Sequence, residues 1–277
     1  MRSLFTTGAL IATFALTSAA SATVLFEEGF SSGANVITTQ IGQNEISYID
    51  YSNFKVGSTS YKLSEATKGK GTSGVLIRSN VNKKVTSAVQ FFAKGANGNA
   101  KSFSGKYTVS WDVFQNTTVP LPKNGSTEWS TWGVGNNDAT KINGYANKRY
   151  NGTWGLALTG GDFKTWDYRV CVDDKIAASI SNETKIAKKA FPKSKYGIEG
   201  TPLGAWTHWE LAVANGKATL SANGVKIFSN ISTTSTDGFA YIGYADRYSS
   251  VNSAPEATWA ILDNFVITDG EPIPEPA

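Results

Sequence analysis

The sequence has a single cysteine, Cys171, and a single histidine, His208, among its 277 residues. One cysteine cannot form a disulfide within the chain, and it cannot build a cysteine-based zinc site. One histidine excludes a metal site with two imidazole ligands, and it makes His208 the sole candidate for a histidine base. Stability must therefore come mainly from a hydrophobic core.

Long apolar runs are also scarce. The clearest one extends from Leu4 to Leu16, after Arg2 and before the small residues Ala20-Ser21-Ala22. It is shorter than the ~20 residues of a membrane span and is interrupted by threonines. A positive start, a short apolar run and a small-x-small site are typical of a secretory signal peptide. We predict that residues 1–22 are cleaved before Thr23 and that the mature chain has no membrane span.

Positive charge is too dispersed to indicate a nucleic-acid-binding protein. The formal net charge is +4, and removing Arg2 with the signal leaves +4 − 1 = +3. The densest run of lysines, from Lys185 to Lys195, has no interleaved stacking aromatic except Phe191. This pattern predicts a solvated surface and no nucleic-acid partner.

Strand patterns dominate the rest of the chain, because apolar residues alternate or form short runs between Gly, Asn, Ser and Lys. From Lys106 to Phe114, odd-numbered residues such as Val109 and Trp111 share one face, and Asp112 lies on the other. Only Asn182 to Ala190 has helical character. Further strands are predicted from Trp154 to Thr159, Trp166 to Val172, Phe239 to Tyr244 and Thr258 to Ile267.

The stretch from Trp206 to Phe228 predicts a three-stranded meander. Asn215-Gly216 and Asn223-Gly224 are two-residue turns that favour type I′ hairpins. The turns fix the register, and both place apolar residues on one face. The predicted pairs are Ala214 with Lys217, Val213 with Ala218, Leu211 with Leu220, Trp209 with Ala222, Ala222 with Val225 and Leu220 with Ile227.

This tryptophan-led strand with its two asparagine-glycine turns resembles the laminin-G-like and concanavalin A-like lectin/glucanase superfamily. The segments from Val24 to Phe30 and from Trp259 to Ile267 look like the first and last strands of that fold. The resemblance implies an all-β, two-sheet antiparallel jelly-roll sandwich, which we expect over residues 23–268. It says little about activity.

The catalytic motif of jelly-roll glucanases is missing. These enzymes carry two carboxylates on one strand as Glu-x-Asp-x-x-Glu, and no glutamate here has aspartate two residues later. An enzyme would need a pair of carboxylates that meet only in the fold, or a lyase-like base at His208 with Tyr168 or Tyr150 as partner. We therefore assign no catalytic residues and keep a polysaccharide-active enzyme as the alternative.

The resemblance also implies a calcium site, because related jelly rolls bind Ca²⁺ where the first and last strands lie side by side. Ca²⁺ prefers carboxylate and carbonyl oxygens. Glu27 or Glu28 with Asp263 would supply carboxylates, supported by Gly29 and Asn264. The alternative is that Glu27 and Glu28 are exposed acids, that Asp263 lies in a strand-end turn, and that no metal binds there. We expect any such calcium to be structural.

Aromatic residues crowd the middle third of the chain. Trp129, Trp132, Tyr145 and Tyr150 lie in a loop-like stretch and are the candidate ligand-binding residues, because sugar rings stack on flat aromatic faces. Core packing is the alternative for each of them. Trp111, Trp154 and Trp166 lie in strand patterns and are predicted to be core residues.

The last nine residues, 269–277, read as a proline-rich linker. Pro274-Glu275-Pro276-Ala277 resembles the opening of the bacterial PEP-CTERM sorting signal, without its apolar helix and basic tail. We therefore expect an exported bacterial surface or matrix protein with a non-catalytic domain that is carbohydrate-binding or adhesive. The predicted partner is a polysaccharide or matrix glycan.

Overall fold

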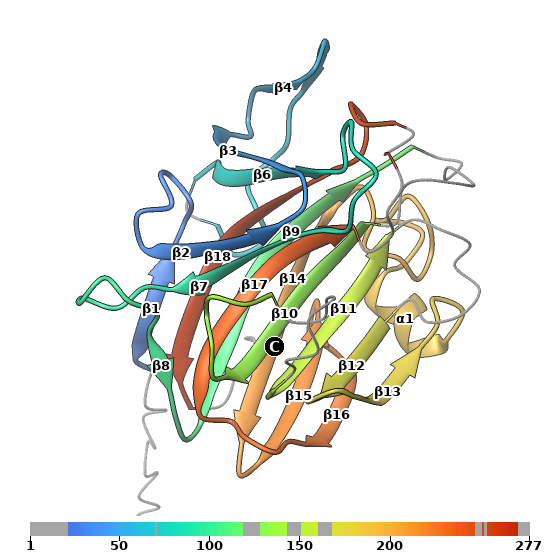
Figure 1. Ribbon diagram of the computed structural model, residues 1–277. Helices are drawn as coiled ribbons and strands as arrows, with labels where there is room; N and C mark the ends of the chain where they lie inside the picture. The colour runs from blue at the N-terminus through green and yellow to red at the C-terminus, as the bar shows by residue number, and fades with distance from the viewer. Residues whose placement is uncertain are drawn as a thin grey trace, which may run out of the picture.

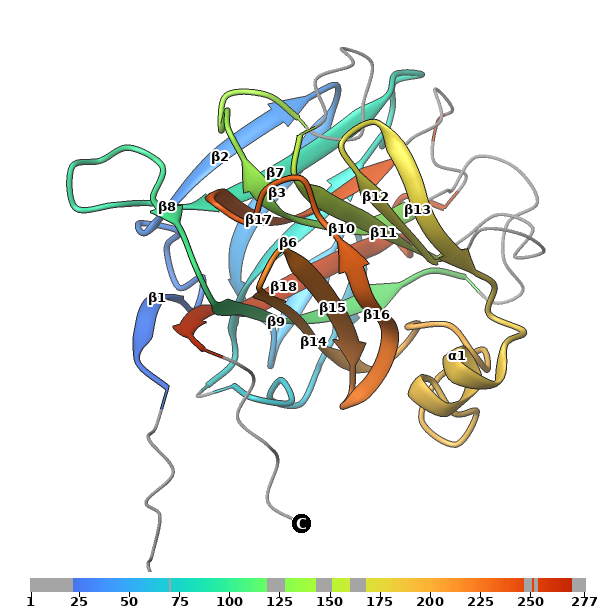
Figure 2. The same cartoon turned by 90° about the horizontal axis from the view of Figure 1, so that it is seen from below.

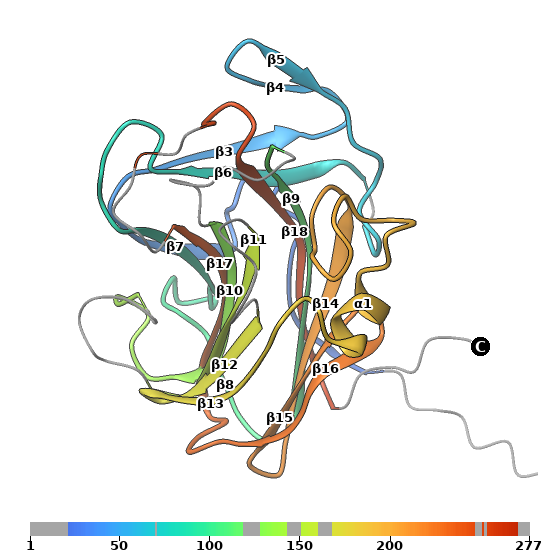
Figure 3. The ribbon, with the colours of Figure 1, turned by 90° about the vertical axis from the view of Figure 1, so that its right-hand side faces the viewer.

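The computed structural model describes residues 22–69, 71–118, 128–142, 151–159, 168–246, 251 and 254–270. Two large antiparallel sheets lie face to face, and Figure 3 shows them edge-on as two layers. The predicted all-β, two-sheet antiparallel jelly-roll sandwich is confirmed. Among the described residues, no helix is long and apolar enough to cross a membrane.

Sheet A contains the first and last strands of the domain side by side, as β1 pairs with β18. Its strand order is β16 (Val225–Ser232), β15 (Lys217–Ala222), β14 (Trp206–Ala214), β9 (Tyr107–Asn116), β18 (Trp259–Asp269), β6 (Ser73–Ser79) and β3 (Asn44–Asp50), with β1 (Val24–Glu28) on β18. The backbone N–H of Thr23 donates to Asp269 Oδ1 at 2.5 Å, which extends this pairing by one residue.

Sheet B faces sheet A and is drawn in front in Figure 1. Its order is β13 (Lys175–Ile180), β12 (Tyr168–Val172), β11 (Thr153–Thr159), β10 (Glu128–Asn136), β17 (Gly238–Asp246), β7 (Ser87–Ala93) and β2 (Val36–Ile41), with β8 (Ser102–Phe103) on β17. A small hairpin of β4 (Phe54–Val56) and β5 (Thr59–Tyr61) forms a sheet of its own, and its Phe54 and Tyr61 pack on Trp259 of sheet A. The helix α1 (Lys185–Ala190) lies beside β16 in Figure 2.

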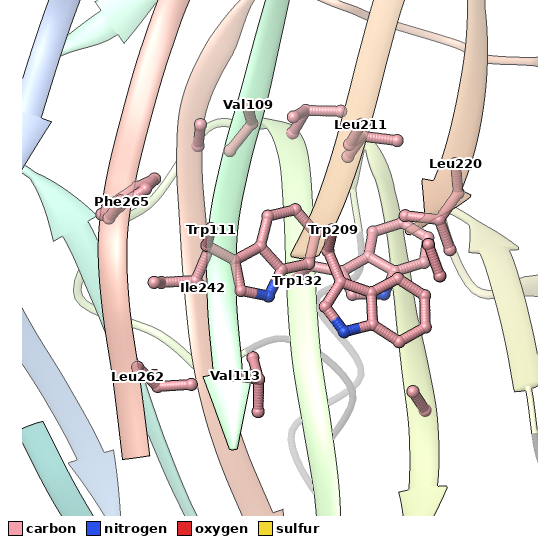
Figure 4. Close-up of a cluster of buried hydrophobic side chains, with 14 of the residues drawn as sticks. Val109, Trp111, Val113, Trp132, Trp209, Leu211, Leu220, Ile242, Leu262 and Phe265 are labelled. Carbon is pink, nitrogen blue, oxygen red and sulfur yellow. The ribbon is translucent and has the colours of Figure 1, made fainter. Parts of the chain in front are cut away.

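The main core fills the space between the sheets (Figure 4). The predicted alternation of β9 is confirmed, because Val109, Trp111 and Val113 are at most 1 % exposed. Trp111 stacks on Trp209 of β14 with ring centroids 6.2 Å apart, and Trp132 enters the same layer from sheet B. Burial of these large apolar surfaces is the dominant stabilising contribution.

The predicted meander is confirmed in all but one pair. The register of β14 with β15 is as computed from the Asn215-Gly216 turn, and Ala222 pairs with Val225. Leu220, however, pairs with Phe228 and not with Ile227, because a bulge shifts the β15–β16 register between Leu220 and Ser221. The extra residue lets β16 bury both Ile227 and Phe228, at 4 % and 6 % exposure.

Candidate functional site

Strand alternation places a row of polar side chains on the outer face of sheet A. Trp111 and Trp209 point into the core, so their neighbours Asp112 and His208 point outward. The register pairs His208 with Asp112, and Asp112 in turn with Asp263. The three side chains thus follow one another across β14, β9 and β18.

Asp112 is fully buried at the centre of this row. Its Oδ1 lies 2.9 Å from His208 Nδ1, and its Oδ2 accepts hydrogen bonds from Asn264 Nδ2 at 2.7 Å and from the Lys68 backbone N–H at 3.1 Å. Both oxygens therefore have partners, which offsets the cost of burying a carboxylate. The segment around Lys68 crosses the outer face of the sheet to make its contact.

His208 is 6 % exposed and is positively charged at neutral pH. Burial by itself lowers the pKa of its imidazole, but the hydrogen bond to Asp112 and the charges of Asp112 and Glu210 outweigh burial and raise the pKa to about 9. Nε2 lies 3.8 Å from Glu210 Oε1, which is beyond hydrogen-bond distance. Glu210 is therefore an ion-pair partner of this N–H that does not form a short hydrogen bond with it, and its interaction with the ring also raises the pKa.

Asp263 is 3 % exposed at the other end of the row. Its Oδ2 lies 2.8 Å from the Tyr51 hydroxyl, and its Oδ1 accepts the Asn264 backbone N–H at 2.6 Å. Burial raises the pKa of this carboxyl to about 7. The two hydrogen bonds lower the pKa, and the nearby negative charges of Asp112 and Glu28 raise it further.

A pocket of about 210 Å³ opens beside the row. Its walls combine apolar surface with polar side chains that include both hydrogen-bond donors and acceptors. They are formed by Glu27, Gly29, Lys68, Gly71, Ser73, Ser110, His208, Asp263, Asn264 and Val266. A concave site with convergent polar groups and shifted pKa values is the first candidate for a functional site.

The residues predicted to bind calcium are brought only partly together. Glu27 and Asp263 line the same pocket, along with Gly29 and Asn264. Glu28 is committed elsewhere, because its two carboxylate oxygens accept the backbone N–H groups of Phe30 at 2.5 Å and Asn35 at 3.0 Å. In the described part of the chain, no three His, Cys, Asp or Glu side chains converge as a metal-binding group. Both oxygens of Asp263 also have protein partners, Tyr51 and the Asn264 N–H, so Glu27 and Asp263 are the predicted carboxylates that reach the pocket wall but they do not form a preassembled ligand set.

The predicted ligand-binding tryptophans lie in a strand and not in a loop. Trp129 and Trp132 are both in β10, where odd spacing sends them to opposite faces of sheet B. Trp132 is 1 % exposed in the main core, which removes it from any surface site. Trp129 faces outward but is only 5 % exposed, against Phe92 and Trp154. Tyr145, Tyr150 and Trp166 lie outside the described residues.

The outer face of sheet B forms a second aromatic layer. Trp154, predicted as core, belongs to this layer with Tyr241 and not to the main core. Part of its cover is the chain around Ala139, whose carbonyl accepts a hydrogen bond from the Thr39 hydroxyl at 2.6 Å. Where the structure describes outward-facing side chains on β7, β10, β11, β12 and β17, none is Asp or Glu.

The partners of His208 differ from those suggested by the sequence. Tyr168 points into the core from sheet B, and its hydroxyl donates to the Gly200 carbonyl, so it cannot assist His208. The tyrosine of the site is Tyr51, and its position was not predicted. Sequence alternation had placed Asp112 on the outer face, but only the β9–β14 register could show that it meets His208.

The chain is similar to known proteins in its three-dimensional structure but not in its sequence. No protein-family model matches the chain, and no curated protein matches it by sequence. An endo-β-galactosidase from Clostridium perfringens that releases GlcNAcα1-4Gal superposes with a TM-score of 0.50 at 10 % identity, over 92 % of this chain and 65 % of that one. The likeness supports the same fold class for this chain, a two-sheet antiparallel jelly-roll sandwich.

Two other solved structures have a similar jelly roll at lower TM-scores. The Emp47p carbohydrate recognition domain has a TM-score of 0.49 at 10 % identity, over 92 % of this chain and all of that one. The binding domain of paraclostridial mosquitocidal protein 1 has a TM-score of 0.45 at 15 % identity, over 91 % of this chain. Our chain spans only half of that protein. At these identities the likeness concerns the fold.

Proposed function

We propose that this chain is an exported protein whose jelly-roll domain binds carbohydrate in the pocket on the outer face of sheet A, without cleaving it. The carrying observation is His208, an imidazolium that is 6 % exposed, lines the pocket and is held at Nε2 only by a long ion pair with Glu210 at 3.8 Å. A charged donor without a short hydrogen bond can form one to a ligand oxygen, and such charge-assisted hydrogen bonds are among the strong ones.

The other walls of the pocket fit hydroxyl groups. A sugar hydroxyl both donates and accepts, and Ser73 and Ser110 do the same, while the Glu27 carboxylate accepts. Asp112 holds the His208 ring through Nδ1, so the N–H is oriented before any ligand arrives. Preorganisation of this kind reduces the ordering cost of binding.

The non-catalytic part of the proposal is supported by sheet B. Its described outward-facing side chains include Gln90, Thr131 and Arg169 among the aromatics, but no Asp or Glu. Glycoside hydrolysis by the usual route needs two carboxyl groups flanking the scissile bond. Those side chains therefore supply polar contacts and apolar surface but no acid–base pair.

The proposal extends to location and to calcium. The signal-peptide pattern of residues 1–22 and the sorting-signal-like end at Pro274 support an exported protein held at a bacterial surface or in its matrix. Calcium is proposed on the acidic side of the pocket, at Glu27 and Asp263, where it would stabilise the β1–β18 contact. That side is separated from His208 by β9.

The binding proposal is tested on a glycan array and by pull-down on insoluble polysaccharides. Ser110→Leu fills the pocket from an outward-facing strand position and should abolish binding while the domain stays folded. Ser221→Leu is the matched control, because Ser221 is also outward-facing and half-buried on sheet A but does not line the pocket. The proposal fails if the folded domain binds no glycan, or if both variants bind equally.

One observation favours an enzyme as the second candidate. The row combines a carboxyl whose pKa is raised to about 7, in Asp263, with a charged His208, and shifted pKa values are frequent among catalytic acids and bases. Release of new reducing ends, or of unsaturated products, from any bound polysaccharide would support it. Loss of that turnover in Asp263→Asn, with binding retained, would replace the binding-only proposal.

A further inference from the structure

The lysine-rich segment from Glu183 to Gly200, here called the lysine lobe, carries a net charge that equals that of the whole predicted mature chain. It contains five lysines and two glutamates, so its formal charge is 5 − 2 = +3. The mature chain is also +3 after loss of Arg2. The lobe consists of α1 and the turns that follow it, beside the edge strand β16 (Figure 2).

Both acidic residues of the lobe form ion pairs with the same lysine. Lys188 Nζ lies 2.8 Å from Glu183 Oε2 and 3.8 Å from Glu199 Oε2. Lys185 and Lys189 are exposed and have no ion-pair partner in the part of the chain that the structure describes. Lys195 is also exposed, and its Nζ lies 5.3 Å from the centre of the Tyr196 ring. The positive charge of the lobe is therefore left largely uncompensated.

The backbone beneath these lysines is held in place by buried contacts. Phe191 stacks on Tyr168 with ring centroids 5.6 Å apart, and the Tyr196 hydroxyl donates to the Trp206 carbonyl at 3.0 Å. Asn223 Nδ2 donates to the Ala190 carbonyl at 3.0 Å, which ties the end of α1 to the β15–β16 turn. The charges thus sit on a fixed scaffold and not on a loose tail, so less ordering is needed on binding.

We infer that the lysine lobe is a contact surface for an acidic polysaccharide, one that bears carboxylate groups along its chain. The positive charge of the lobe is complementary to a polyanion. The residue types of the lobe then distinguish one class of polyanion from another. The inference rests on the proposed carbohydrate-binding function and names the class of glycan.

The composition of the lobe favours a carboxylated glycan over nucleic acid or membrane. Its aromatic residues Phe191 and Tyr196 are buried, at 0 % and 2 %, so no ring is presented for stacking on bases. It has no arginine, the side chain that grips phosphate with two parallel hydrogen bonds. Ile186, 43 % exposed, is its only exposed large apolar residue, which is too little to anchor the lobe in a bilayer.

The test compares polygalacturonate with its fully methyl-esterified form, which keeps the sugar backbone and loses the charge. Binding is measured by affinity electrophoresis at low and moderate salt. The triple variant Lys185→Gln, Lys189→Gln, Lys195→Gln should bind polygalacturonate roughly tenfold more weakly, since each exposed ion pair contributes modestly. The control triple variant Lys62→Gln, Lys83→Gln, Lys84→Gln removes three exposed lysines elsewhere and should bind as the original does.

Each outcome has a defined consequence. Tight binding of polygalacturonate that weakens with salt and with the lobe variant alone supports the inference. Equal binding of the methyl ester, equal loss in both variants, or no binding of polygalacturonate overturns it. Stronger lysine-dependent binding to DNA or to anionic vesicles also overturns it. If a neutral glycan still binds in the pocket, the proposed function survives the failure of this inference.

Discussion

The Tyr51 hydroxyl lies 2.8 Å from Asp263 Oδ2 and 2.9 Å from the carbonyl oxygen of Gly71, and it also accepts the Ala66 N–H at 3.2 Å. A tyrosine has one hydroxyl proton, so it can donate to only one of those two oxygens. In the chain without bound metal, all four groups are satisfied when Asp263 carries a proton and donates it to Tyr51, while Tyr51 donates to Gly71. The geometry thus agrees with the raised pKa of Asp263.

Stability should fall as pH rises. The pKa of Asp263 is raised from 3.8 to about 7, so the folded state holds this proton more tightly than the unfolded state. The stabilisation from the protonated carboxyl is complete below pH 4 and is lost as pH rises through 7. In Asp263→Asn, the amide mimics the protonated acid, and the slope of unfolding free energy between pH 5 and 8 should flatten. Urea unfolding with EDTA present measures this. Asp50→Asn is the control, because the pKa of Asp50 is lowered and its titration is over by pH 5.

The charge of His208 should depend on Asp112. Since His208 is the only histidine, its imidazole gives a single, unambiguous set of NMR signals for titration. We expect a pKa near 9 in the original chain and a clearly lower value in Asp112→Asn, where burial still lowers the pKa and only Glu210 still raises it. Glu210→Gln should lower the pKa less.

The Asp112→Asn change should also destabilise the domain by about 3–5 kcal/mol, because one partner of a buried charged pair is left alone. The contribution of the His208 charge to the unfolding free energy is complete below pH 6.5 and is lost as pH rises through 9. The original chain and Asp112→Asn should therefore differ least in stability at high pH. An unchanged pKa of His208 in Asp112→Asn would show that the contact with Asp112 is not the cause of the raised pKa.

Calcium should raise the melting temperature of the domain. A ligand that binds only the folded state stabilises it by mass action, so a chelator should lower the melting temperature and added Ca²⁺ restore it. Glu27→Gln should remove the response, whereas Glu183→Gln, on the lysine lobe, should leave it intact. A melting temperature indifferent to chelator would refute the calcium site.

Signal-peptide cleavage should create a new ion pair. If the mature chain starts at Thr23, its backbone nitrogen becomes an ammonium group 2.5 Å from Asp269 Oδ1. Asp269→Asn should then lower the unfolding free energy by up to about 1 kcal/mol, the scale of an exposed pair. A chain that keeps Ala22 lacks the ammonium at this place and should lose less. N-terminal sequencing of the secreted protein checks the cleavage itself.

The fold was predictable from local patterns where turns set the register. Asn215-Gly216 leaves one low-energy pairing, so the β14–β15 register followed from the sequence. The bulge between Leu220 and Ser221 did not follow, because it depends on Phe228 finding room in the core. Placing Trp132 in a loop was wrong because glycines and serines around it hid the strand alternation.

The site was predictable only in parts. Outward orientation of Asp112 and His208 follows from the apolar neighbours that face the core, and Asp263 was expected near the first strand. The meeting of Asp112 with Asp263 and Tyr51 depends on strands far apart in sequence, and no local pattern encodes such contacts. The long ion pair between His208 Nε2 and Glu210 depends on a 3.8 Å separation that only coordinates reveal.

The pairing of β1 with β18 also bears on the order of events during export. Val24 meets Thr268, so the first strand has no partner until nearly the whole domain has emerged. Contacts between such distant residues form late, because a long loop must close before they stabilise anything. If the chain is exported as we propose, it should therefore stay unfolded during translocation and close its sandwich only on the far side of the membrane.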